Sequence, residues 1–185
     1  SEVDGVLLDI GLSNRQLFDS KRGFSFLHNE PLIMTFAASP QNDVLTAKEI
    51  VNTWDEDNIA DILYGYGDER YARRIAKSIV EARNSAEITT TKQLTDIITQ
   101  CVPKSLLHKK THPATKTFQA LRMTVNDELG ALREGIHKAV KILKPKGRVA
   151  IISFHSGEDR IVKNIFKELQ RESLIHIKKK KPITP

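Results

Sequence analysis

The sequence lacks the features that several large classes of protein require. Its single cysteine, Cys101, excludes an internal disulfide framework and a cysteine-rich zinc site. No apolar run approaches the roughly 20 residues of a membrane-spanning helix, and the longest, such as residues 149–152, have the length of a strand. The nine glycines form neither a G-x-G-x-x-G nor a P-loop pattern, so no dinucleotide or phosphate fingerprint is present. We therefore expect a soluble globular protein in a reducing, cytoplasmic setting, with no membrane partner.

The histidines give no indication of a metal site. Of the six in the sequence, only His108 and His112 stand four residues apart, and no third ligand accompanies them. A zinc ion in a protein takes at least three protein ligands. We predict that the chain holds no metal.

Positive charge is in excess and is concentrated in one part of the chain. Lysine and arginine number 29 against 23 aspartates and glutamates, a formal net charge of +6. Residues 97–126 contain no acidic residue, and a second basic run covers residues 178–181. Such a stretch is either a solvated face or a contact for a polyanion such as RNA. The candidate RNA-binding side chains within it are Lys104, Lys109, Lys110, Lys116 and Arg122.

Two apolar segments far apart in the sequence predict buried parallel strands. Residues 6–8 lead to Asp9, and residues 148–154 follow a turn at residues 144–147 and lead to His155. The chain between these segments has mainly helical periodicity. This order predicts an α/β fold in which a partial sheet is interrupted by an inserted helical domain.

Helical patterns are clear in several places. Capping boxes begin at Thr46 and at Thr90. An apolar stripe over residues 118–143 predicts one long helix, or two with a bend near Asn126. A helix starting near Glu158 and a third strand are expected at the end of the chain. The predicted domains are residues 1–30, part of the sheet domain; residues 31–112, an inserted helical substrate-recognition domain; and residues 113–185, the sheet domain continued with helix, strand, helix and a strand at residues 174–177.

Polar groups at the ends of the two predicted strands are the candidate site. Asp9 stands where open α/β sheets hold ligands, and its carboxylate can accept hydrogen bonds from a ribose or an amine. The alternative is that it caps the following turn. Residues 153–160 are either a base-binding and catalytic loop or a helix entry with Ser156 as N-cap, and the two roles are compatible.

Five motifs in order together resemble one family, the bacterial small-subunit ribosomal RNA (cytosine-N4)-methyltransferases known as RsmH or MraW. The motifs are residues 4–13 (DGVLLDIGLS), 22–26 (RGFSF), 66–70 (YGDER), 112–122 (HPATKTFQALR), and 153–156 (SFHS) with 158–160 (EDR). The sequence departs from the family pattern at Ile33 and Thr35, where the family has aspartate and arginine, and at Gly157, where it has leucine.

The resemblance implies a Rossmann-like class I methyltransferase fold and S-adenosyl-L-methionine as cofactor. It implies that Asp9 and Gln16 contact the cofactor, and that Ser13, Phe154 and His155 lie near the target base. The implied substrate is a cytidine of 16S rRNA in the small ribosomal subunit, held by the helical insertion and its basic residues.

In this family a glycine-rich cofactor loop would precede Ser1, and an arginine-rich segment would follow Pro185. We therefore expect a fragment that is inactive by itself. Two other classes of function stay open on the residues alone. One is a non-catalytic rRNA-binding or ribosome-assembly module, which needs no cofactor; the other is a different Rossmann-type nucleotide enzyme that uses Asp9.

Overall fold

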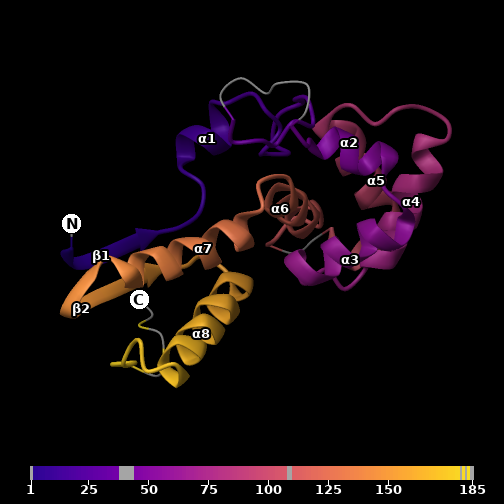
Figure 1. Cartoon of the computed structure of the whole chain (residues 1–185). Coiled ribbons are helices and arrows are strands. Elements are labelled where there is room, and N and C mark those ends of the chain that lie inside the picture. Colours follow the sequence, from indigo (N-terminus) through magenta and orange to yellow (C-terminus); the bar gives the residue numbers. More distant parts are fainter. Residues whose placement is uncertain (1, 38–43, 108–109, 180, 182, 184–185) are drawn as a thin grey trace. The chain divides into compact units, whose positions relative to one another are not determined.

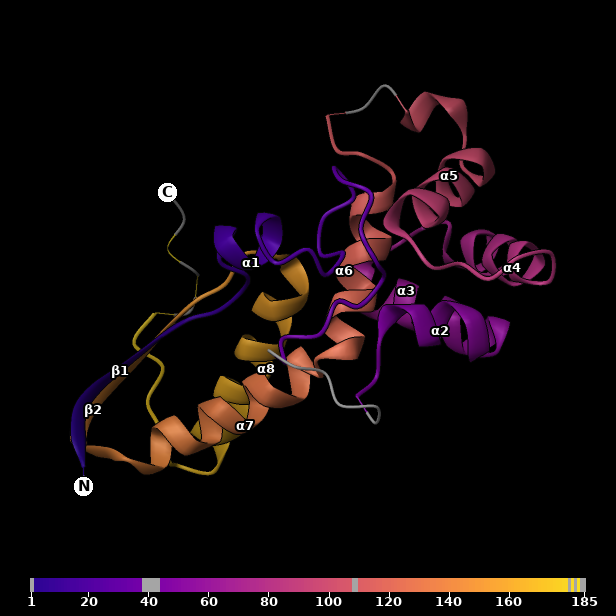
Figure 2. The ribbon, with the colours of Figure 1, turned by 90° about the horizontal axis from the view of Figure 1, so that it is seen from above.

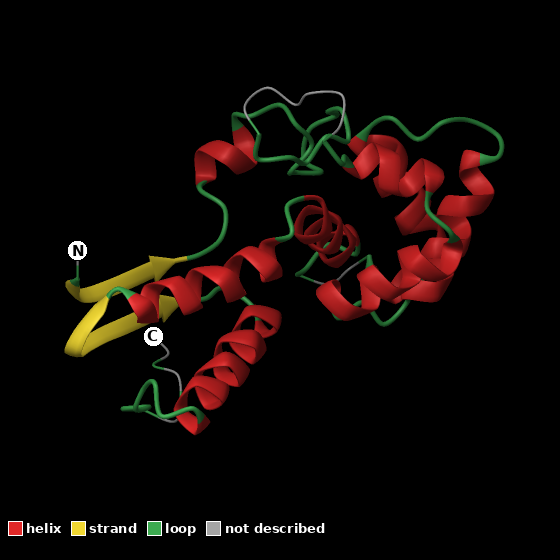
Figure 3. Ribbon diagram, viewed as in Figure 1, coloured by secondary structure: helices red, strands yellow, loops and turns green. Residues whose placement is uncertain are grey.

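The computed structural model describes residues 2–37, 44–107, 110–179, 181 and 183 (Figure 1). Within these residues it has eight α-helices, one short 3-10 helix and a two-stranded sheet (Figure 3), so the predicted α/β class is confirmed at this level. The elements are, in order, β1 (Val3–Asp9), α1 (Asn14–Phe18), α2 (Ala47–Thr53), α3 (Glu56–Gly67), α4 (Ala72–Arg83), α5 (Thr91–Cys101), η1 (Lys104–Leu106), α6 (Ala114–Val125), α7 (Glu128–Lys141), β2 (Leu143–Ile152) and α8 (Ser156–Arg171).

The chain divides into two compact units. The sheet unit is Ser1–Gly11 with Glu128–Pro185, and the helical unit is Leu12–Asp127. The helical unit covers more residues than the predicted insertion at 31–112. It includes α6, which the predicted boundaries place in the sheet domain. The description of residues 31–112 as an inserted domain stays a prediction. No helix in the described part of the chain is long and apolar enough to cross a membrane.

The sheet unit is built on the parallel pair that the sequence predicts. Gly5 lies opposite Arg148, and Asp9 lies opposite Ile152. The register shifts before Gly5, because residues 144–147 bulge out within β2 instead of forming a turn ahead of it. Lys146 has a φ of 71° in this bulge. The Lys144 ammonium also lies 3.0 Å from the Asp4 carboxylate.

One face of the strand pair packs on helices α7 and α8. Alternate side chains such as Leu8 and Ile10 lie against the buried cluster, while Leu7 points the other way and is 65% exposed. This alternation follows from the two-residue period of a strand. The cluster itself consists of Leu132, Ile136, Ile165 and Leu169.

The third strand, predicted at residues 174–177, is wrong: this segment is irregular. Its backbone bonds return to α8, since the Leu174 N–H donates to the Leu169 carbonyl at 2.9 Å and the Ile177 N–H donates to Gln170 Oε1 at 3.1 Å. A short apolar run becomes a strand only when another strand is available to pair with it, and this segment is held by the helix end instead.

The helical unit has the larger core. Helix α3 packs on α4 and α6, and α4 lies between α2 and α5 (Figure 2). Helices α3 and α6 approach so closely that a Cβ at Gly67 would lie 2.7 Å from the Lys116 carbonyl oxygen, which requires glycine there. The fully buried side chains of this core include Ile50, Ile59, Leu63, Ile75, Ile79, Leu94, Ile98 and Leu121.

The apolar stripe over residues 118–143 forms two helices, the second of the two alternatives. Helix α6 ends at Val125, and Asp127 adopts a left-handed φ of 42°. Asn126 explains the break: its Nδ2 donates to the carbonyl oxygens of Met34 and Arg122, both at 2.8 Å, and its Oδ1 accepts from the Phe36 N–H at 2.7 Å. A side chain that bonds the backbone in this way competes with helix continuation.

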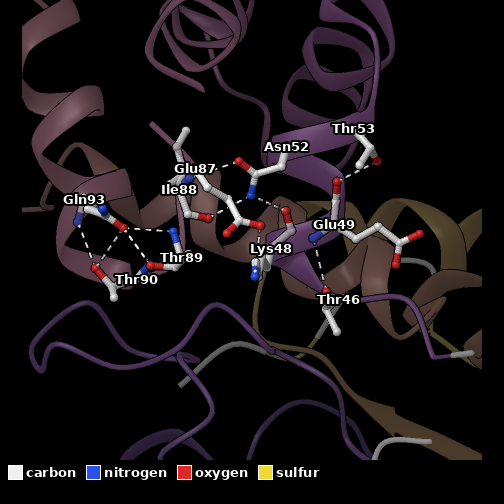
Figure 4. A network of polar contacts seen from close by, with 10 residues as sticks. All are labelled: Thr46, Lys48, Glu49, Asn52, Thr53, Glu87, Ile88, Thr89, Thr90 and Gln93. Carbon is white, nitrogen blue, oxygen red and sulfur yellow. Dashed lines mark hydrogen bonds and ion pairs between the residues drawn. The ribbon is translucent and has the colours of Figure 1, made fainter. Parts of the chain in front are cut away.

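The segment before α5 is fastened to α2 by Asn52 (Figure 4). Asn52 Nδ2 donates to the carbonyls of Lys48 at 2.7 Å and Ile88 at 2.8 Å, and its Oδ1 accepts from the Ile88 N–H at 2.9 Å. The predicted capping box of Thr90 with Gln93 is confirmed. At Thr46 only the N-cap is confirmed: Thr46 Oγ1 accepts from the Glu49 N–H, but no return bond from the Glu49 side chain is present among the described residues.

We predict that Asn52→Ala lowers the free energy of unfolding by about 1–3 kcal/mol, because it leaves the buried Ile88 N–H and C=O without their partner. Thr53→Ala is the matched control on the same helix, since Thr53 is exposed and its hydroxyl, as far as the described residues show, bonds the Glu49 carbonyl alone. Urea unfolding of both variants is the measurement. Equal loss in the two variants would contradict the role given to Asn52.

Candidate functional site

The carboxyl ends of β1 and β2 lie side by side. Asp9 is opposite Ile152, and the Ile10 N–H donates to the Ile152 carbonyl at 3.2 Å. Residues 153–155 follow directly, so the two segments singled out in the sequence meet at one edge of the sheet. This is the edge where open α/β sheets bind ligands.

The Asp9 side chain is exposed and available to a ligand. Its carboxylate forms no hydrogen bond or ion pair within the described part of the chain. The following turn is capped by other groups, because Ser13 is the N-cap of α1. The structure therefore gives no support to the alternative in which Asp9 caps that turn.

Phe154 presents an exposed ring at the same edge. Its side chain is 69% exposed and lies against Gly11, where an added Cβ would stand 3.1 Å from ring atom Cδ2. Gly11 also has a φ of 112°, which side chains rarely adopt. Glycine at this position thus allows the ring to approach the end of β1 closely.

The segment that carries Phe154 is fixed by Glu158. The Glu158 side chain is 4% exposed, and its Oε2 accepts from the Phe154 N–H at 2.8 Å. Its Oε1 lies 3.1 Å from His155 Nε2, and its backbone N–H donates to His155 Nδ1 at 3.3 Å. One buried residue thereby holds the backbone of Phe154 and both ring nitrogens of His155.

The prediction that Ser156 caps the last helix is wrong, because His155 is the N-cap of α8. His155 has the extended backbone that an N-cap needs, with φ −150° and ψ 161°, and its imidazole accepts from the third residue of the helix. In this arrangement Nδ1 accepts the cap bond, and the buried Nε2 lies 3.1 Å from Glu158 Oε1. The predicted place of His155 near the base stays a prediction. Ser153 is likewise tied down, since its hydroxyl donates to Asp159.

Ser13 and Gln16 also serve a local function. Ser13 Oγ accepts from the Gln16 N–H at 3.2 Å, while Gln16 Oε1 accepts from the Ser13 N–H and from Ser13 Oγ, both at 3.1 Å. This capping box starts α1 in the helical unit, and the structure does not relate it to Asp9 or Phe154. The cofactor role of Gln16 and the base-side role of Ser13 stay predictions. Gln16 Nε2 makes no hydrogen bond within the described residues.

The five basic side chains predicted to bind RNA have different surroundings. Lys104 and Lys110 are exposed, and Arg122 is half-buried on α6. Lys116 is exposed, but its Nζ donates to the Asp68 carbonyl at 2.7 Å and so caps the end of α3. Lys109 lies outside the described residues. Their contact with RNA stays a prediction.

The motif at residues 22–26 has a structural role that the sequence did not predict: it holds the segment at residues 30–37 by hydrogen bonds. The Gly23 N–H donates to the buried carboxylate of Glu30 at 2.9 Å, and a Cβ at Gly23 would stand 2.2 Å from the Pro31 carbonyl oxygen. Arg22 Nη1 donates to the backbone carbonyls of Thr35 at 3.0 Å and Ala37 at 2.6 Å. Because Arg22 uses carbonyls, the change to Thr35 does not affect these contacts. Nothing in the structure explains the changes to Ile33 and Gly157.

A parallel strand pair with ligand-facing groups at its carboxyl ends and helices on one face is typical of an α/β enzyme that binds a cofactor or nucleotide. The comparison with known families is specific: the chain belongs to the MraW methylase family, whose model matches residues 1–184.

Relatives share about half of their aligned residues with this chain. A protein of Sulfurihydrogenibium sp. (strain YO3AOP1), named ribosomal RNA small subunit methyltransferase H, is 48% identical over 184 residues, which is 100% of this chain and 61% of the relative. Proteins of the same name from Deinococcus deserti and Symbiobacterium thermophilum are 52% and 50% identical, over 88% and 89% of this chain. This chain covers 52% and 51% of their respective lengths.

Glu158 is ionised at neutral pH. Burial raises the pKa of its carboxyl, but hydrogen bonds from the His155 side chain and the Phe154 N–H outweigh burial and hold that pKa below its ordinary value. A carboxyl whose pKa is lower in the folded state contributes stability above its unfolded pKa, about 4.3 for glutamate. That contribution is lost as the pH falls through the folded pKa.

We predict that Glu158→Gln lowers the free energy of unfolding at pH 7 by about 1–3 kcal/mol, the cost of hydrogen-bonded groups left with a poorer partner. The difference from the unmodified chain shrinks at a pH below the folded pKa of Glu158, where its carboxyl is protonated in the folded and in the unfolded chain. Urea titrations at the two pH values measure it. Glu168→Gln on the same helix is the control, because Glu168 is exposed and lies 3.5 Å from Arg133. A loss independent of pH would contradict this account of Glu158.

Proposed function

We propose that this chain is the part of an S-adenosylmethionine-dependent rRNA (cytosine-N4)-methyltransferase that carries the base side of the active site and the RNA-recognition helices. Its substrate is 16S rRNA of the small ribosomal subunit. The names of the relatives support the substrate and the reaction type. The observation that carries the proposal is the meeting of Asp9 and Phe154 at the carboxyl ends of β1 and β2.

The residues at this edge suit the cofactor. When bound, S-adenosylmethionine supplies an electrophilic methyl group on a sulfonium. Asp9 offers an exposed carboxylate that can accept hydrogen bonds from an ammonium or a hydroxyl. Gln16 belongs to the helical unit, and its Nε2 offers two donors. Gly11 lets the Phe154 ring approach the same strand end, where an added Cβ would stand 3.1 Å from ring atom Cδ2. Asp9 is therefore the residue at this edge that would hold the cofactor, and Gln16 is the second cofactor residue that the family resemblance implies.

Methyl transfer to cytosine N4 depends more on the orientation of the base than on a catalytic acid or base. The N4 lone pair is delocalised into the ring, so the amine is a weak nucleophile and must be aligned with the methyl group. An exposed aromatic ring such as Phe154 can stack on a base taken out of its helix, and hydroxyl or carboxylate oxygens can accept the N4 hydrogens. In this scheme Glu158 and His155 position Phe154. The family resemblance, not the geometry, makes Ser13 the candidate acceptor.

The helical unit supplies the RNA contacts in this proposal, as an inserted substrate-recognition domain. Lys104, Lys110 and Lys116 are exposed on it. Folded rRNA is recognised mainly through its shape and its backbone, for which lysine and arginine are suited. A non-catalytic ribosome-assembly module would share these basic residues, but it would have no use for an open carboxylate beside an exposed ring.

We predict that Asp9→Ala in the full-length methyltransferase weakens S-adenosylmethionine binding by about 1–3 kcal/mol, because the cofactor's donors lose a charged acceptor. Isothermal titration with the cofactor measures this. Asp4→Ala is the control, because Asp4 is an exposed aspartate toward the other end of the same strand. If Asp9→Ala kept full cofactor affinity while methyl transfer fell, Asp9 would belong to the base instead. If both stayed intact, this edge would not be the site.

A further inference from the structure

The motif at residues 66–70 has no part in the site described so far. It spans the end of α3 and the connection to α4, where the structure has a hollow of about 620 Å³. Tyr64 of α3, Arg70 and Tyr71 of the connection, and Arg73 and Arg74 of α4 line this hollow. All of them lie in the helical unit, so the hollow is formed within one compact part of the chain.

The lining combines an aromatic face with guanidinium groups. Tyr64 is 70% exposed, which is unusual for so large a ring on a packed helix. The Arg70 guanidinium carbon lies 6.0 Å from the centre of the Tyr71 ring, and Arg70, Arg73 and Arg74 are all exposed. Aromatic rings and arginine planes are the surfaces on which unpaired RNA bases stack, and arginine forks match phosphate oxygens.

Nearby acids neutralise little of this charge. Asp61 is the acidic residue that lines the hollow, against three arginines. Asp57 stands 4.0 Å from Arg73, and both side chains are close to fully exposed. The interaction energy of such an exposed ion pair is small, so it holds the Arg73 guanidinium only weakly. The side chains that line the hollow therefore carry an excess of positive charge, while the Glu69 carboxylate is buried behind Tyr71.

Two hydrogen bonds fix the connection between α3 and α4. Lys116 Nζ donates to the Asp68 carbonyl at 2.7 Å, and the buried Glu69 carboxylate accepts from the Tyr71 N–H at 2.8 Å. Asp68 closes α3 in a left-handed conformation, with φ 48° and ψ 36°. A rim that is fixed before binding loses less conformational entropy when it takes a ligand. Lys116 thus supports this surface as well as carrying charge of its own.

We infer that the hollow between α3 and α4 holds an unpaired nucleotide of the RNA substrate, with its base on Tyr64 and its phosphate on Arg70, Arg73 and Arg74. This inference rests on the proposed function, because it needs RNA as the substrate. It adds a contact site that is separate in sequence from the basic run at residues 97–126.

The test is the affinity of the full-length protein for transcribed 16S rRNA at several salt concentrations. Tyr64→Ala should weaken binding about 5- to 150-fold, the range for loss of a stacked base, with no change in salt dependence. Tyr64→Phe should bind RNA with nearly the affinity of the unmodified protein, because it keeps the aromatic ring. Arg73→Ala with Arg74→Ala should weaken binding and flatten the slope of log K against log salt by about 1.4, or roughly 0.7 for each phosphate contact.

Lys77→Ala is the matched control. Lys77 is an exposed cation of α4 outside the hollow, paired with Glu81 at 3.8 Å. Cofactor affinity, measured in every variant, should stay unchanged. If the Tyr64 and arginine variants bind RNA as Lys77→Ala does while the unmodified protein methylates 16S rRNA, the inference is wrong and the proposed function stands. If the unmodified protein neither binds nor methylates 16S rRNA, both are wrong.

Discussion

The parallel pairing of β1 with β2 is the constraint on which the proposed site depends. The strands come from opposite ends of the sequence, and their register sets Asp9 against Ile152. Since both strands run in the same direction, the residues that follow them emerge at one edge. A shift of one residue would turn Asp9 to the other face of the sheet. The bulge at residues 144–147 takes up the mismatch at the far end, so the register near the site is regular.

Helix α8 fixes the position of the segment that follows β2. Its first turn supplies Glu158, which is buried and holds the Phe154 N–H and the His155 ring together. A buried carboxylate is stable only when its oxygens are paired, so the segment after β2 has one favoured path. Phe154 is left with its ring outward beside Gly11. An exposed aromatic ring in a fixed position is suited to a stacking partner that arrives from outside.

Local patterns in the sequence were sufficient for much of the fold. The capping box at Thr90 depends on neighbours in the chain, and the structure confirms it. Local patterns also predicted the strand at Asp9 and the break near Asn126, and the structure confirms both, but distant partners complete them: β2 pairs with the strand, and the backbone at Met34 and Phe36 bonds Asn126. Longer-range contacts could not be foreseen. The sequence does not show that Lys116 bonds the Asp68 carbonyl across 48 positions, or that residues 174–177 find no strand to pair with. The cap at His155 was missed because serine is the commoner N-cap and stood next to it.

The most direct test of the account is nucleoside analysis of 16S rRNA treated with the full-length protein and S-adenosylmethionine. The account predicts N4-methylcytidine from the unmodified protein. It predicts a rate lower by about 5- to 150-fold from Phe154→Ala, the range for loss of base stacking, with cofactor affinity retained. Phe154→Tyr should keep most of the activity. Methylation of a different base, or undiminished transfer by Phe154→Ala, would contradict the claim that the ends of β1 and β2 form the base side of the site.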